Sequence, residues 1–210
     1  MPRVSEPELI HAGLNLKNHP PAALAQVESG VFGFWVFLMS DAVMFALLFA
    51  IFGTMLNTPG VANPDPEFKI TPAFLETFAL LSSSFSYGMV SLCLKRNAGR
   101  LWVGLWLAVT FCLGAWFLDM ECHDFLSMFK HHATPESSGT ISAYFVLVGT
   151  HGIHVTSGLI WILMMVAQMS LHGLDERTKI NFIRLGLFWH FLDVVWVCIF
   201  SIVYLRGLIG

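Results

Sequence analysis

Seven acidic or histidine side chains fall inside, or at the end of, long apolar stretches of the sequence. They are Asp41, Glu76, Glu121, His151, His154, His190 and Asp193. An uncompensated charge at the centre of a bilayer costs about 2.5 to 3.5 kcal/mol on insertion scales. Such residues therefore face protein or water, stay neutral, or are paired. These seven are the candidates for a polar site inside a membrane-embedded fold.

The spacing of these residues favours hydrogen bonds between histidine and carboxylate. His151 and His154 are three positions apart, as are His190 and Asp193, and side chains at that spacing share one face of a helix. A bond between imidazole and carboxylate, within or between the fourth and fifth apolar stretches, is geometrically reasonable. Asp41, His151 and Asp193 each lie about 12 to 16 Å from one end of their stretch, so all three can occupy one central layer.

Four interpretations of this polar set remain open on the residues alone. Buried polar side chains often link helices within a membrane bundle, and chains of acids and histidines also form proton or ion pathways. Solute transport is a third interpretation, but the sequence has no pair of glycine-interrupted helices to support it. Haem or metal ligation is the fourth, since histidine is a common ligand in helical cores. Two histidines three apart on one helix cannot clamp opposite faces of a haem.

The composition predicts the elements that must position these residues. Of the 210 residues, 56% are hydrophobic and 12% are charged, whereas soluble domains carry about 25% charged residues. Five apolar stretches reach the roughly 20 residues that a membrane-spanning helix needs. We expect an all-α integral membrane protein, a bundle of five transmembrane helices with spans near 31–56, 71–94, 101–121, 140–169 and 185–208.

The chain divides into two parts by polarity. Residues 1–30 are polar and rich in proline, without the apolar core of a signal peptide, and predict a cytoplasmic arm. Residues 31–210 predict a single five-helix membrane domain. The net charge of −3 and the lack of a long basic tract make nucleic acid an unexpected partner.

Basic residues set the expected orientation. Eight of the eleven lysines and arginines fall in the N-terminal arm, the second connection and the fourth connection. Cytoplasmic segments carry the excess of Lys and Arg in membrane proteins. We therefore expect a cytoplasmic N-terminus and a periplasmic C-terminus.

Small residues crowd the second span, at Ser82, Ser83, Ser84, Ser86 and Gly88. Such a run lets a neighbouring helix approach closely. The hydroxyls can bond back to their own helix or across to the next one.

Four blocks of the sequence resemble subunit III of the haem-copper respiratory oxidases. They are FWVFLMSDAVMFALLFA at 34–50, FLDMECHDF at 117–125, THGIHVTSG at 150–158 and FWHFLDVVW at 188–196. The mitochondrial type of this subunit has seven spans and a glutamate in place of Asp41. Five spans and the aspartate resemble the bo-type ubiquinol oxidase form, with a five-span subunit III of a bacterial aa3-type cytochrome c oxidase as the alternative.

The resemblance implies an accessory role in the aerobic respiratory chain. The complex would oxidise ubiquinol, reduce dioxygen to water and pump protons across a bacterial inner membrane. This multi-pass chain would hold no catalytic, cofactor-binding or metal-binding residue, because the haems and copper belong to subunit I. Its expected partners are subunits I and II, a small subunit IV and membrane lipids, with structural phospholipid among them.

Asp41 matches an acidic residue that has been treated in this family as a candidate for proton uptake. The pumping channels belong to subunit I, so we favour a structural role for Asp41 and for the other six polar residues. The alternative from a different functional class is an autonomous proton channel or transporter built on Asp41, Glu76, His151, His190 and Asp193.

Overall fold

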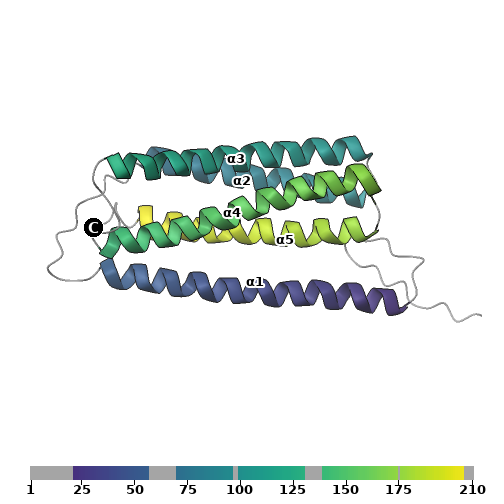
Figure 1. Ribbon diagram of the computed structural model, residues 1–210, viewed down its shortest axis with the longest axis horizontal. Coiled ribbons are helices and arrows are strands. Elements are labelled where there is room, and N and C mark those ends of the chain that lie inside the picture. The colour runs from purple at the N-terminus through teal and green to yellow at the C-terminus, as the bar shows by residue number, and fades with distance from the viewer. Residues whose placement is uncertain (1–20, 57–69, 97–98, 131–138, 175, 206–210) are drawn as a thin grey trace, which may run out of the picture.

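The computed structural model consists of five long helices lying side by side (Figure 1). It describes residues 21–56, 70–96, 99–130, 139–174 and 176–205. The helices are α1 (Pro21–Leu56), α2 (Ile70–Lys95), α3 (Arg100–Lys130), α4 (Gly139–His172) and α5 (Glu176–Ile199), and α5 continues as a π-helical segment over Phe200–Leu205. All five are long and apolar enough to cross a membrane. The predicted all-helical, five-span architecture is confirmed.

The helices extend beyond several of the predicted limits. α1 begins at Pro21, within the stretch assigned to the polar arm, where a proline suits the first helical position. α3 continues to Lys130 rather than stopping at 121, and α5 begins at Glu176 rather than 185. Charged side chains end an apolar run without ending a helix. Residues 1–20 of the predicted arm and residues 57–69, between the first two helices, lie outside the described residues.

Four of the helices form a ring, and the first lies outside it. α2 packs along α3, α3 along α4, α4 along α5, and α5 closes the ring on α2. α1 contacts only α4 and α5 among the described residues, and it occupies one edge of the bundle in Figure 1. Successive helices run in opposite directions, so the two ends of the described chain lie at opposite ends of the bundle (Figure 1).

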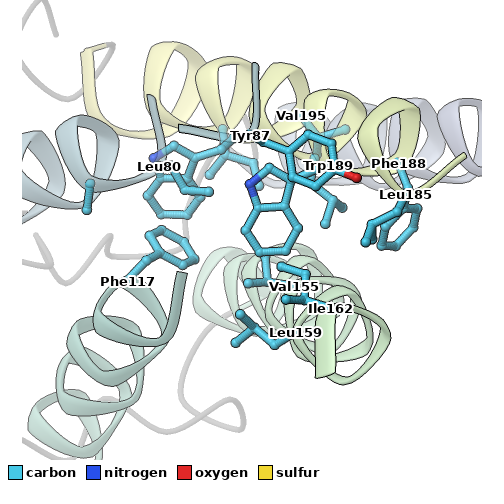
Figure 2. Packing of buried hydrophobic residues seen from close by; sticks show 14 of the residues in the cluster. Leu80, Tyr87, Phe117, Val155, Leu159, Ile162, Leu185, Phe188, Trp189 and Val195 are labelled. Carbon is cyan, nitrogen blue, oxygen red and sulfur yellow. The ribbon is translucent and has the colours of Figure 1, made fainter. Parts of the chain in front are cut away.

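Trp189 of α5 is at the centre of the core (Figure 2). It reaches α3 and α4 at two glycines: a Cβ added at Gly114 or Gly158 would stand 2.9 Å from the indole ring. Its Nε1 donates a hydrogen bond to the Ser83 hydroxyl of α2 at 3.1 Å. One tryptophan therefore joins α5 to the other three helices of the ring, and only glycine leaves it enough room.

Candidate functional site

The predicted polar residues do not form one site, because the structure divides them among three places. Asp41 and His154 lie between α1 and α4. His190 and Asp193 lie on α5 beside α2. Glu76 of α2 and Glu121 of α3 are buried near each other, with Glu121 against α4, and His151 of α4 is buried among aromatic rings.

Asp41 and His154 form a pair across two helices. Their Oδ2 and Nε2 atoms are 3.4 Å apart, and the side chains are 14% and 20% exposed. Nδ1 of His154 lies 2.7 Å from the carbonyl oxygen of Thr150, which can only accept, so Nδ1 donates. The other ring nitrogen faces the carboxyl group. The contact joins α1 to α4 by polar side chains.

His190 is linked to α2. Its Nδ1 is 2.6 Å from the Ser84 hydroxyl and 3.9 Å from Oδ2 of Asp193 on its own helix. The second distance is too long for a hydrogen bond. The sequence left open whether this pair bonds within or between the fourth and fifth spans, and the bond of His190 across helices joins α5 to α2.

The Ser84–His190–Asp193 arrangement has the residue types of a hydrolase triad without its geometry. In such a triad the serine and the carboxylate meet different ring nitrogens. Here both approach Nδ1. These residues therefore cannot pass a proton from the serine through the ring to the carboxylate.

Glu76 and Glu121 are almost completely buried, with 1% and 4% of their surface exposed. Glu121 is within electrostatic range of Glu76 and Asp124. Its carboxyl oxygens lie against the backbone of α4, 3.0 and 3.2 Å from where a Cβ on Gly152 would stand. Neither Glu121 oxygen has a hydrogen-bond partner among the described residues. Gly152 is thus needed to leave room for this acidic group.

His151 is fully buried, unlike His154. Its ring lies 5.3 Å from that of Trp196 and 5.8 Å from that of Phe117. Neither nitrogen has a hydrogen-bond partner among the described residues. Asp41 and His151 therefore do not pair, although their depths are similar.

The serine-rich stretch of α2 behaves as predicted. Ser83 bonds back to Leu80 and accepts from Trp189, while Ser86 bonds across to the carbonyl of Trp106. Thr77 was not among the predicted residues, but its hydroxyl accepts a hydrogen bond from Nε1 of Trp196 at 3.1 Å. A buried indole N–H usually finds a hydrogen-bond partner, so Trp196 was itself a signal to look for an acceptor.

The arrangement can link helices. Among the described ranges, no group of three or more His, Cys, Asp or Glu side chains could hold a metal ion. Five apolar helices joined by buried polar side chains define a multi-pass helical membrane protein.

Comparison with known proteins identifies the family. The sequence matches cytochrome c oxidase subunit III over residues 18–208. It is 42% identical over 182 residues to cytochrome bo(3) ubiquinol oxidase subunit 3 of Pseudomonas putida, covering 85% of this chain and 86% of that protein. The chain belongs to the cytochrome c oxidase subunit III family, as its four sequence blocks predicted.

Two relatives from Bacillus subtilis differ in their named donors. Quinol oxidase subunit 3 is 40% identical over 189 residues, covering 88% of this chain and 92% of the relative. Cytochrome c oxidase subunit 3 is 39% identical over 199 residues, covering 91% and 93%. The family therefore serves complexes with either donor, and subunit III alone separates them weakly.

Proposed function

We propose that this chain is the accessory subunit III of a proton-pumping ubiquinol oxidase of the cytochrome bo type. The observation that carries the proposal is the 42% identity to a bo(3) ubiquinol oxidase subunit 3 over most of both chains. In this role the chain stabilises the subunit that holds the haems and copper. Ubiquinol is oxidised and dioxygen is reduced outside this chain.

The proposal includes the setting of the subunit. The chain crosses a bacterial inner membrane five times, with its N-terminus cytoplasmic and its C-terminus periplasmic, as the distribution of Lys and Arg favours. Its partners are subunits I and II and a small subunit IV, with phospholipid at its apolar surface. The seven intramembrane polar residues are structural in this proposal, and the contact between Asp41 and His154 supports that role.

A five-span subunit III of an aa3-type cytochrome c oxidase is the second candidate, favoured by the 39% identity to such a subunit. The test is to purify the complex through a tag on this chain and to follow oxygen uptake with ubiquinol or with reduced cytochrome c. We expect a haem-containing preparation that consumes oxygen with ubiquinol. Activity with cytochrome c alone would select the second candidate, and a colourless preparation of this chain alone would reject both.

An autonomous proton channel would behave differently. The purified chain in proteoliposomes would conduct protons, and Asp41→Asn would abolish the flux. The geometry disfavours this function, because the rings of Phe117 and Trp196 lie against His151, and neither nitrogen of His151 has a hydrogen-bond partner among the described residues. We expect no proton flux above that of empty vesicles.

A further inference from the structure

His190 lies at the middle of its membrane span with much of its ring uncovered. Its span is Thr178–Val203, which places it about 18 Å from the first residue and about 20 Å from the last. Its side chain is 50% exposed. By contrast Trp189, one position earlier, is 1% exposed and lies in the core (Figure 2). His190 therefore points out of the bundle at the depth where lipid tails would otherwise surround it.

The ring still has an unmet hydrogen-bonding atom. Its polar contacts with described residues are all made by Nδ1, so Nε2 has no partner in that part of the chain. If Nε2 carries the proton it needs an acceptor, and if it does not it can accept from a donor. Hydrocarbon supplies neither, and leaving such a group unpaired in an apolar medium is costly.

The surroundings of His190 form a surface with a defined shape. Val194 and Val197 continue along α5 with 62% and 40% exposure, and Leu81 on α2 is 50% exposed. Gly88 lies one turn from Ser84 on α2, and a Cβ added there would meet nothing within 4 Å. We call this surface the α2–α5 face, and it consists of Leu81, Ser84, Gly88, His190, Val194 and Val197. It is largely apolar, lacks a side chain at Gly88, and carries at mid-depth one hydrogen-bonding atom, Nε2, that has no partner among the described residues.

The outer surface of α4 provides the contrast. Val146 and Ile153 are 51% and 72% exposed there, with Gly149 between them. The exposed hydroxyl of Ser157 donates to the carbonyl of His154 on its own helix at 2.7 Å. That surface satisfies its polar group internally, as suits contact with lipid tails. The α2–α5 face does not.

We propose that the α2–α5 face receives a transmembrane helix of the haem-bearing oxidase subunit, which presents one hydrogen-bonding group to Nε2 of His190 at mid-depth. This inference rests on the proposed function, because membership of an oxidase complex supplies such a helix. Lipid tails can fill the apolar part of the face but cannot bond to Nε2. A second copy of this chain would have to bring its own His190 to the same place, and it is a separate outcome of the test.

The first experiment uses the assembled oxidase in native membranes. The photo-reactive residue benzoylphenylalanine replaces Val194 in one variant and Ile153 in a second variant. The cross-linked products of each variant are identified by mass spectrometry. We expect a covalent product with the haem-bearing subunit from position 194 and lipid adducts from position 153. The proposal is overturned if position 194 yields only lipid adducts or dimers of this chain, or if the haem-bearing subunit is captured from position 153 instead.

Purification through a tag on the unmodified chain distinguishes failure of the proposed function from failure of the proposed contact. If a tag on it recovers no haem, the proposed function fails. If it recovers haem but position 194 does not capture the haem-bearing subunit, only the location of the contact is wrong.

The second experiment compares substitutions at two glycines, Gly88 and Gly149. A Cβ added at either position would meet no atom of this chain within 4 Å. Gly88→Leu adds bulk to the α2–α5 face, and Gly149→Leu adds the same bulk to the surface of α4. In complexes purified through the haem-bearing subunit, we expect Gly88→Leu to reduce retention of this chain by about tenfold, which corresponds to about 1.4 kcal/mol. Gly149→Leu should leave retention unchanged. Equal retention of both, or loss confined to Gly149→Leu, contradicts the proposal.

His190 itself gives a chemical test. We expect His190→Leu to reduce retention in the complex, and His190→Gln, whose amide can still donate and accept, to restore part of it. Chain levels in the membrane and helix content serve as controls for folding. If the His190→Leu variant is retained in the complex as well as the unmodified chain, Nε2 makes no contact with the partner and the inference fails.

Discussion

α1 and α5 both pack against α4, but by different means. Of the five spans, that of α5 is the most buried and that of α1 the least buried. α5 approaches α4 at Gly158, where the Trp189 ring fills the space that a side chain would need. α1 places Asp41 beside His154. Close packing therefore holds the inner helix, while the outer helix adds a polar contact to a smaller apolar one.

The two histidine–aspartate pairs repeat this contrast. His154 and Asp41 belong to different helices and are largely covered. His190 and Asp193 share one helix, and the histidine is half exposed. The same two residue types thus connect helices in one place and leave a hydrogen-bonding atom available in the other. Residue identity gives the capacity for the bond, and the neighbouring helix decides how it is used.

The largest effect is expected from filling the contact between α4 and α5. A Cβ at Gly158 would stand 2.9 Å from Trp189 and 3.2 Å from Phe188, so Gly158→Val should destabilise the chain by about 1 to 3 kcal/mol or more through overpacking. Denaturation with SDS in mixed micelles, followed by tryptophan fluorescence, measures the effect. Gly149→Val makes the same change in the same helix without a neighbour within 4 Å. Equal effects of both would contradict the packing argument.

The next largest loss of stability is expected from weakening the contact between α1 and α4. Asp41→Ala leaves Nε2 of His154 without its partner in a largely covered position, at an expected cost of about 1 to 3 kcal/mol. The same denaturation measurement applies, and Ser40→Ala, at an exposed neighbouring position, is the control. If the two variants unfold alike, the carboxyl group contributes nothing to the attachment.

A double-mutant cycle on Asp41→Asn and His154→Gln isolates the pair itself. Interhelical polar contacts in membrane proteins average about 0.6 kcal/mol and reach about 1.7 kcal/mol. Because these two groups are 3.4 Å apart, we expect a coupling free energy of about 0.6 kcal/mol. Additive single effects would show that Asp41 and His154 act separately.

The smallest loss of stability is expected from removing the hydrogen bond to His190. Ser84→Ala removes the 2.6 Å bond to His190, but the ring is half exposed and can reorient. In the purified full chain the expected loss is about 0.5 kcal/mol, at the lower end for a neutral hydrogen bond. Ser157→Ala, which breaks only a bond within α4, is the comparison. A loss as large as that of Asp41→Ala would remove the difference between the two pairs.

Much of the fold could be predicted because hydrophobicity and span length are local properties. The end of the first span, both limits of the second and the start of the fourth agree with α1, α2 and α4 to within a residue or so. The limits of α3 and α5 were missed because the third span was ended at Glu121 and Thr178 was left outside the fifth span, although both residues are buried in the bundle. Polarity along the chain does not reveal which side of a helix another helix covers.

The sequence alone determined that this protein has five membrane-length helices, that seven costly polar residues lie among them, and that its motifs belong to the oxidase subunit III family. Each follows from composition, spacing or motif order. Only the tertiary structure decided that His154 meets Asp41, that His190 meets Ser84 and that His151 meets no polar partner among the described residues. The reason is geometric: the rotation of each helix and the helix beside it determine whether a polar atom is paired, buried or exposed, and neither is set by residue spacing within one helix.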